Sequence, residues 1–376
     1  MNKFYIIGTL ILALIGLRAV DPFPIESMRL KTFDYFISTL PNIGDENILL
    51  VDIDDDSLQQ LGQWPWPREV FCRFLGPGVT GFSVLFPEED RFGGDKNLAK
   101  CIKGNAVVVS AAASNADSAG KPPHVGTSSI GEDPKPFLFS YKGVLNNVER
   151  IEEAAIGNGV TSTAPEVDNL VRRLPLVFNI NDTLYPSFGL EVLRAAADAK
   201  SYTLKTNKTG IEALRVKGLP VITTDPNARV WATWNTKFSR ISAKDYVEKA
   251  PQYPIVLLGV TARGASTLVS TPDGLKAPHE IQASAISTLL QGKNIARPDW
   301  ADGAEILALI IILGAIAALA FNLYFSIPAL IVTIAASIGY TSYTFSNSYT
   351  LLDPSYIIFA AFITWAVTSF ISFYTQ

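Results

Sequence analysis

Four apolar stretches constrain this chain more than any other feature of its sequence. Each is close to the roughly 20 residues that a helix needs to cross a bilayer. One lies at the start of the chain and three follow one another at its end, at residues 4–20, 303–323, 327–345 and 355–374. The segment between them holds nearly all the charge of a chain that is 48% hydrophobic. We therefore predict three parts, namely a transmembrane anchor, a water-facing domain and a transmembrane region, at residues 1–20, 21–302 and 303–376.

The flanks of the apolar stretches indicate how the chain is oriented. Lys3 precedes the first stretch, Arg18 can snorkel at its far end, and the small-residue cleavage pattern of a signal peptide is poor. We therefore expect an uncleaved anchor rather than a cleaved signal. Four spans then place residues 21–302 outside the cytoplasm and Gln376 inside. Tyr324–Ser326 is predicted to be the turn between the second and third spans.

Composition excludes several classes of site. The net charge of −4 offers no basic face for a nucleic acid. Two cysteines and two histidines cannot assemble a Cys/His zinc cluster, and neither a metal nor another cofactor is predicted. Cys72 and Cys101 can form a disulfide if their domain lies outside the cytoplasm. Two buried free thiols explain these cysteines equally well.

The water-facing segment alternates strands and helices, which is typical of an α/β domain with a largely parallel sheet and flanking helices. The expected strands are 47–53, 81–86, 105–113 and 253–260, and the expected helices are 67–75, 95–102, 186–199 and 278–292. Residues 213–225 and 228–234 predict a smaller antiparallel layer. Ser114–Pro136 is rich in Ser, Gly, Pro and Asp, and predicts a surface excursion.

The sequence LGQWPWPREV, at residues 61–70, alternates two tryptophans with two prolines. Each proline fixes its own backbone and extends the residue before it, so the stretch predicts a rigid elbow between two helices. If the elbow is a plug, Trp66 seals the core and Arg68 pairs with Asp52 or Asp54. If it is a binding rim, the rings and the guanidinium contact a small polar ligand. We expect the elbow to be mainly structural.

An enzymatic interpretation begins from VDIDDDSL, where Asp52 and Asp54 end an apolar strand. Two such carboxylates can hold Mg²⁺ and supply a nucleophile, so an extracytoplasmic metal-dependent hydrolase is an alternative function. That chemistry expects a hydroxyl two residues after the second aspartate, but Ser57 lies one residue too late. The structural alternative is that Asp55 or Asp56 caps the next turn. We predict that the chain is not an enzyme.

Several blocks of the sequence resemble, in their order, the type-two CHASE domain, a bacterial sensory extracellular domain found on cyclases and histidine kinases. The blocks are ILLVDIDDDSLQQLGQWPWPRE, GFSVLFPEED with GGDKNLAK, DNLVRRLPL with LYPSFGLEVLR, and VLLGVTARGASTLVSTPDG with HEIQASAISTLLQG. The layout of one membrane helix before the domain and three after it also fits that family. The resemblance implies a sensor of a small-molecule or envelope signal that is anchored in the cell (inner) membrane of a bacterium.

Four residues depart from the pattern of that family. Ser83 replaces an expected aspartate, Asn169 an expected glycine, and His279 and Gln282 an expected glycine and histidine. Relatives continue into a kinase or cyclase, and we expect no such domain after the last helix here. The signal is therefore expected to pass through the membrane helices to a separate kinase or cyclase, or to a second copy of the chain. A degenerate receptor with a structural role is the alternative.

Ligands of parallel sheets bind beyond the carboxyl ends of the strands. The first strand ends at Asp52 and Asp54, and the loop Thr261–Ser266 follows another central strand, so both are expected at that edge with the elbow nearby. Arg68 and the two aspartates are the first candidates for contact with an unidentified small ligand. The complete set of candidate ligand-binding residues is Asp52, Asp54, Trp64, Trp66, Arg68, Arg172, Thr261 and Arg263.

Overall fold

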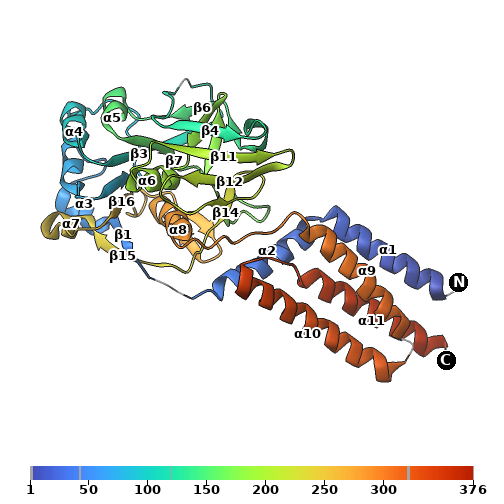
Figure 1. The fold of residues 1–376 in the computed structure, drawn as a ribbon. Helices are drawn as coiled ribbons and strands as arrows, with labels where there is room; N and C mark the ends of the chain where they lie inside the picture. Colours follow the sequence, from blue (N-terminus) through green and yellow to red (C-terminus); the bar gives the residue numbers. More distant parts are fainter. Residues whose placement is uncertain (1–2, 42–43, 119, 320–321, 376) are drawn as a thin grey trace. The chain divides into compact units, whose positions relative to one another are not determined.

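The computed structural model describes residues 3–41, 44–118, 120–319 and 322–375. The chain divides into two compact units (Figure 1). A helical unit and a sheet unit comprise, respectively, residues 1–40 with 295–376, and residues 41–294. The predicted boundaries after residues 20 and 302 refer to the membrane surface, and they stay predictions.

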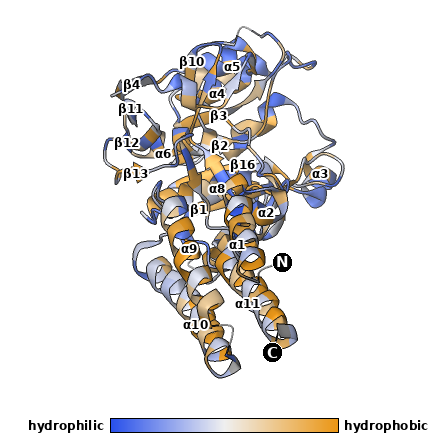
Figure 2. Ribbon diagram, turned by 90° about the vertical axis from the view of Figure 1, so that its right-hand side faces the viewer, coloured by the Kyte–Doolittle hydropathy of each residue, from blue (hydrophilic) through white to orange (hydrophobic). Residues whose placement is uncertain are grey.

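The helical unit contains the helices α1 (Lys3–Val20), α2 (Phe23–Ser38), α9 (Ala301–Leu319), α10 (Leu323–Ser348) and α11 (Ser355–Thr375). In the described part of the chain, α9, α10 and α11 are each long and apolar enough to cross a membrane. The pair of α1 and α2 passes the same test together, but it is bent by 70° at the break between the two helices. Figure 2 shows the hydrophobic residues that run along these helices.

The core of the helical unit joins the N-terminal helix to the C-terminal ones. Leu14 of α1 packs in one cluster with Leu309 and Leu313 of α9 and with Tyr356 of α11. The Tyr356 hydroxyl also donates a hydrogen bond of 2.6 Å to the backbone carbonyl of Leu14. Segments from both ends of the chain therefore form a single bundle.

The predicted turn between α9 and α10 is wrong. Tyr324–Ser326, which we expected to form it, belongs to the first turn of α10. The side chain of Asn322 caps this helix by accepting a hydrogen bond from the backbone N–H of Tyr324. The apolar pattern did not reveal this boundary, because a cap depends on one polar side chain rather than on hydrophobicity.

The sheet unit is built on a seven-stranded sheet of order β15-β1-β16-β2-β3-β6, with β7 also paired to β3. Its strands are β1 (Gly44–Ile53), β2 (Val79–Phe82), β3 (Val107–Ser114), β6 (Gly143–Leu145), β7 (Gly157–Val160), β15 (Lys237–Ser242) and β16 (Ile255–Val260). Its neighbouring strands are parallel except for the pair of β3 and β6. The prediction of a largely parallel sheet is confirmed.

Helices cover both faces of this sheet, and the alternation of side chains along each strand decides which core they enter. Ile48 and Leu50 of β1 pack in one cluster with residues of α6 (Phe188–Ala196) and α8 (Pro278–Leu290). Leu49 and Val51 pack in a second cluster. That cluster includes residues of α3 (Asp55–Leu61), the 3₁₀ helix η1 (Arg68–Phe74), α4 (Asp95–Ile102), α5 (Glu149–Ala154) and α7 (Ala243–Lys249).

Smaller sheets complete the unit. A four-stranded sheet contains β13 (Ile222–Thr223), β12 (Gly210–Val216), β11 (Ser201–Asn207) and β4 (Gly126–Ile130). β4 runs parallel to β11, so the predicted surface excursion contains a strand. The other strands are β5 (Ser140–Tyr141), β8 (Arg173–Pro175), β9 (Val177–Ile180), β10 (Thr183–Pro186), β14 (Arg229–Trp231), β17 (Val269–Thr271) and β18 (Gly274–Lys276), and η2 (Lys135–Phe137) is a short 3₁₀ helix. The α/β class with smaller antiparallel layers is confirmed.

The two cysteines of the chain are close together in this unit. Cys72 of η1 and Cys101 of α4 form a disulfide between two elements on the same face of the sheet. Of the two alternatives that the sequence left open, the structure has the bonded one. The disulfide closes a loop that contains β2, a central strand of the sheet.

Candidate functional site

Five side chains meet at the carboxyl ends of β1 and β15 and at the start of α8. We call them the edge network, which consists of Asp52, Arg240, His279, Glu280 and Lys276. The Asp52 carboxylate accepts hydrogen bonds from the Arg240 guanidinium at 3.0 and 3.2 Å, and its Oδ1 lies 2.8 Å from His279 Nε2. Glu280 accepts from Arg240 at 3.0 Å and from Lys276 at 2.9 Å. Positive and negative groups therefore alternate from Lys276 through Glu280 and Arg240 to Asp52.

Strand register and helix position bring these residues together. Asp52 lies opposite Ser242 of β15 and Gly259 of β16, so the three parallel strands end at a common edge. His279 and Glu280 lie in the first turn of α8, where the positive end of the helix dipole favours a carboxylate. The edge network thus links the strands β1 and β15 to the first turn of α8.

His279 is completely buried, with 0% of its surface exposed. Its ring lies against the backbone of Gly259, where an added Cβ would be only 2.1 Å from Nδ1. Nδ1 has no hydrogen-bond partner among the described residues. A glycine at this position in β16 is therefore what lets the imidazole reach Asp52.

The Asp52 carboxylate is held in its charged form. Burial by itself raises the pKa of Asp52, because desolvation disfavours the charged group. The hydrogen bonds and charges of His279 and Arg240 outweigh this effect and hold the pKa at about 2. The edge network consequently stabilises the folded sheet unit at neutral pH.

Asp52→Asn is expected to lower the free energy of unfolding by about 2 kcal/mol at neutral pH. This is the free energy that corresponds to a pKa of about 2 for Asp52 in the folded state, compared with the ordinary value of 3.8. Because the folded-state pKa is lowered, this contribution is present above about pH 4 and is lost as the pH falls towards 2. Urea unfolding of both proteins in nanodiscs, from about pH 7 to about pH 2, measures the difference. A difference that stays constant over this range would contradict the role given to Asp52.

Asp54 has a different role from Asp52. It is the N-cap of α3, and its Oδ1 accepts hydrogen bonds from the Ser57 backbone N–H at 2.8 Å and hydroxyl at 2.6 Å. The Ser242 hydroxyl donates to the same oxygen at 2.9 Å. The cap is therefore Asp54, and the prediction of Asp55 or Asp56 is wrong, because the helix starts one residue earlier than expected.

These contacts bear on the hydrolase alternative. Asp52 and Asp54 both accept hydrogen bonds from protein donors, and Asp52 is paired with a guanidinium rather than with a second carboxylate. No group of three or more His, Cys, Asp or Glu side chains that could hold a metal ion occurs among the described residues. The arrangement thus gives the hydrolase alternative no geometric support.

The loop after β16 reaches the edge that was predicted for it. The backbone N–H groups of Thr261 and Ala262 both donate to the carbonyl of Ile53, at 3.0 and 2.9 Å. Arg263 donates its N–H to Asp55 at 2.9 Å, and its side chain is 95% exposed. Of the candidates, Thr261 and Arg263 therefore lie beside Asp52 and Asp54, and the Arg263 guanidinium faces solvent.

The Trp66 side chain of the elbow is buried in the core and is only 1% exposed. The ring stacks on Phe74 at 6.0 Å between centroids, and its Nε1–H donates to the carbonyl of Gly62 at 2.6 Å. Trp64 is half-buried and packs edge-on against Trp66 at 5.8 Å. The predicted helix 67–75 is the 3₁₀ helix η1, and Pro67 precedes it as its N-cap rather than opening it. These contacts give Trp66 the environment of a core residue.

Arg68 does not pair with Asp52 or Asp54 as the plug interpretation expected. Its Nε lies 3.2 Å from an oxygen of Asp95, and it donates to the Glu88 carbonyl at 3.0 Å. Its guanidinium also lies over the Phe86 ring, at 4.6 Å. These partners belong to the segment that follows β2, and β16 lies between β2 and β1 in the sheet. Arg68 therefore makes its contacts beside β2 and not beside β1.

The remaining candidate, Arg172, is buried and donates to both carboxylate oxygens of Asp168, at 2.7 and 2.8 Å. Asn169, where a glycine was expected, has a φ of 62° in the left-handed region, which asparagine tolerates better than most residues. Gln282 accepts a hydrogen bond from the Gly189 N–H at 2.9 Å. Arg172 and Gln282 thus have hydrogen-bond partners within the sheet unit.

Sequence reasoning missed most of the edge network. Arg240, Lys276, Glu280 and His279 were not among the candidates, and Ser242 was also overlooked. Asp52 lies 188 residues from Arg240 and 227 from His279 along the chain. Such separations leave no spacing pattern to detect. The only available signal was a histidine and a glutamate in the first turn of a predicted helix.

Comparison with known protein families gives one match. The chain matches the CHASE2 domain over residues 9–319. No curated protein and no solved structure gives a significant match. The matched region extends from the first apolar helix through the sheet unit to the end of α9. This protein therefore belongs to the CHASE2 family of sensory extracellular domains.

Proposed function

We propose that this protein is a membrane-anchored extracytoplasmic sensor. Its sheet unit receives a small-molecule or envelope signal at the carboxyl edge of the parallel strands. The signal passes through the membrane helices to a separate kinase or cyclase, or to a second copy of the chain. Membership of the CHASE2 family supports the sensory role, and the Cys72–Cys101 disulfide supports an oxidising compartment for the sheet unit.

One observation carries the proposal, namely that the edge network joins the sheet to α8. Asp52 belongs to the sheet, whereas His279 and Glu280 belong to the first turn of α8. A ligand that competes for Asp52 or Arg240 changes the contacts that hold this turn in place, and so favours one position of α8 over another. α8 ends at Leu290 and α9 begins at Ala301, so residues 291–300 connect the two covalently.

Arg240 is the member of the network that a ligand reaches first, because its side chain is 41% exposed. Arg240→Gln removes the charge that bridges Asp52 and Glu280, and is expected to loosen the start of α8. In the full chain in nanodiscs, hydrogen exchange of residues 291–300 should then become about fivefold faster, the change that ~1 kcal/mol produces in an opening equilibrium.

Lys205→Gln is the matched control, because Lys205 pairs with Glu212 on the surface of a different sheet. It should leave exchange of residues 291–300 at the wild-type rate. Equal rates in the two variants would refute the link from the edge network to the membrane helices. Crosslinking in membranes then identifies the partner as a kinase, a cyclase or a second copy.

Reporter fusions test the orientation. A fusion at Ser118, in a segment between strands of the sheet unit, is expected to report an extracytoplasmic location, because a disulfide-bonded unit follows the first apolar helix. A fusion after Gln376, which lies outside the described residues, is expected to report a cytoplasmic location. Fusions at Lys3 and Leu268 are the matching controls for the cytoplasmic and the extracytoplasmic location, respectively. A cytoplasmic signal at Ser118 would overturn the proposed topology.

A further inference from the structure

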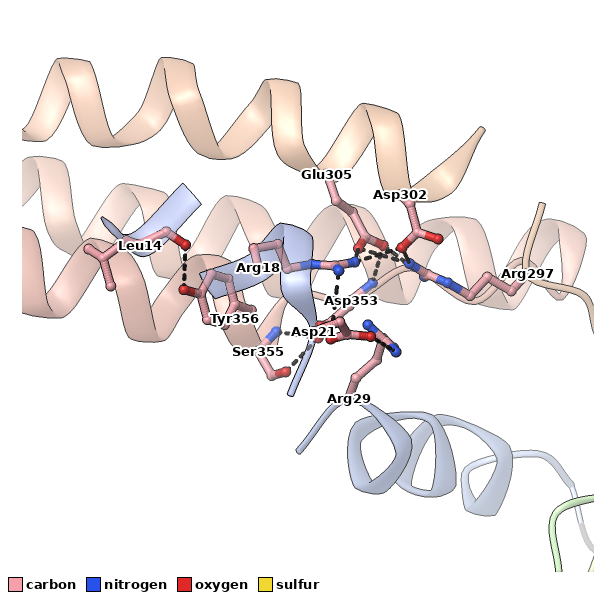
Figure 3. A network of polar contacts seen from close by, with 10 residues as sticks. All are labelled: Leu14, Arg18, Asp21, Arg29, Arg297, Asp302, Glu305, Asp353, Ser355 and Tyr356. Atoms are coloured by element: carbon pink, nitrogen blue, oxygen red, sulfur yellow. Dashed lines mark hydrogen bonds and ion pairs between the residues drawn. The ribbon is translucent and has the colours of Figure 1, made fainter. Parts of the chain in front are cut away.

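Seven charged side chains gather in the helical unit where α1 ends and α9 begins (Figure 3). We call them the junction cluster, which consists of Arg18, Asp21, Arg29, Arg297, Asp302, Glu305 and Asp353. Arg18 pairs with Asp302 at 2.7 Å and with Glu305 at 2.8 Å. Arg297 pairs with the same two carboxylates, at 2.6 and 2.8 Å. Glu305 therefore shares two guanidinium groups with Asp302.

The cluster has one negative charge too many, because three arginines face four carboxylates. Arg29 pairs with Asp21 at 2.5 Å, which leaves Asp353 as the carboxylate without an ion pair among the described residues. Asp353 is 2% exposed. Its Oδ1 accepts hydrogen bonds from the backbone N–H and the hydroxyl of Ser355, at 2.9 and 2.5 Å, whereas Oδ2 has no partner in the described part of the chain.

The Oδ2 atom of Asp353, buried without a hydrogen bond from the described residues, lowers the stability of the folded chain. A buried carboxylate without compensating charge is strongly disfavoured. Burial raises the pKa of Asp353 because desolvation disfavours the charged form, and the bonds from Ser355 only partly oppose this. A positive group that came within reach of Oδ2 would therefore be bound favourably.

A cavity of about 260 Å³ lies beside Asp353, between α9, α10 and the start of α11. The small residues Ala304, Ala308 and Ala336 leave this space open, and Glu305 and Asp353 are its charged lining residues. Ile312 lines it seven residues after Glu305, roughly 10 Å further along α9. The cavity therefore has an acidic end near the start of α9 and an apolar end deeper in the bundle.

We propose that this cavity binds a single-tailed amphiphile with a primary ammonium head group, the ammonium lying against Asp353 and the tail lying between α9 and α10. An ammonium group supplies the missing positive charge and three hydrogen-bond donors. The volume holds roughly nine groups of the size of a water molecule or a methylene, at about 30 Å³ each. A chain of about eight carbons with an amine therefore fits the space. This proposal is independent of the signal received by the sheet unit.

The test uses the full chain in nanodiscs, with n-octylamine as the probe. The thermal unfolding midpoint is measured against probe concentration, since a ligand that binds only the folded state raises it. n-Octanol and octanoate have the same tail with a neutral or an anionic head, and ethanolamine has the amine without the tail. We expect a saturable rise in the midpoint with octylamine and none with the other three compounds.

Two variants locate the site, and one controls for the bilayer. Asp353→Asn should weaken octylamine binding at least tenfold, about 1.4 kcal/mol. Ala308→Phe fills the cavity and should abolish binding. Ala315→Phe makes the same change on α9 at an exposed residue outside the cavity lining, and should bind like the wild type.

Two results would overturn the proposal. An equal response of wild type, Ala308→Phe and Ala315→Phe would show that octylamine acts through the bilayer. An equal response to octanol and octylamine would show that the charge of Asp353 is not recognised. Both comparisons stand even if Asp353→Asn fails to fold, because neither depends on that variant.

Discussion

Trp66→Ala is expected to lower the free energy of unfolding of the sheet unit by about 3–5 kcal/mol, the usual loss for a buried aromatic ring. The ring is 1% exposed and contacts Trp64, Phe71 and Phe74, so its removal leaves a cavity that these rigid neighbours cannot close. Urea unfolding of the full chain in nanodiscs, monitored by circular dichroism, measures the change.

Two further variants separate packing from binding at the elbow. Trp66→Phe keeps a stacked ring but loses the bond to the Gly62 carbonyl, and should cost about 1 kcal/mol. Trp64→Ala removes the half-buried neighbour and should cost less than Trp66→Ala. If Trp66→Ala instead kept wild-type stability but lost its response to a signal, the elbow would be a binding rim.

Gly259→Ala is the second substitution with a large expected effect, about 3 kcal/mol of lost stability. Its new Cβ would lie 2.1 Å from Nδ1 of His279 and 2.4 Å from Cγ, so β16 or α8 has to move. Because His279 is fully buried, its ring cannot swing into solvent without breaking the bond to Asp52. Chemical unfolding of the same nanodisc preparation gives the value.

A double-mutant cycle identifies the cause. In a His279→Ala background the clash is absent, and Gly259→Ala should cost less than half as much, with an interaction energy of about 1–3 kcal/mol. Gly44→Ala in β1 is the matched control, because the nearest atom to its Cβ would be 3.8 Å away. Additive costs in the cycle would show that His279 does not determine the requirement for glycine.

The two substitutions lie in different parts of the sheet unit. Gly259 and Asp52 occupy paired positions in β16 and β1, whereas Trp66 of the elbow packs in one cluster with residues of the segment after β2. The edge network and the elbow therefore have different tasks. Trp66 closes the core, and the charged groups around Asp52 remain accessible through Arg240. This division favours the edge network over the tryptophans as the site for the ligand that we propose.

Elements with a strong local pattern could be predicted from the sequence. The apolar run 47–53 became β1, because a strand buried on both faces has a continuous hydrophobic sequence. The helix predicted at 95–102 is α4, with the same bounds. The boundaries that failed depend on single polar groups. Asn322 decided where α10 begins, and Asp54 decided where α3 begins.

The sequence by itself determined the apolar helices, the parallel sheet and the presence of two aspartates at the end of its first strand. Only the tertiary structure decided which partners those aspartates have. Asp52 pairs with Arg240 and His279, and Arg68 pairs with Asp95 instead. The physical reason is that hydrophobic periodicity is a local property, whereas an ion pair requires two groups whose distance depends on strand order and register. That order placed β16 between β1 and β2, and so separated Arg68 from Asp52.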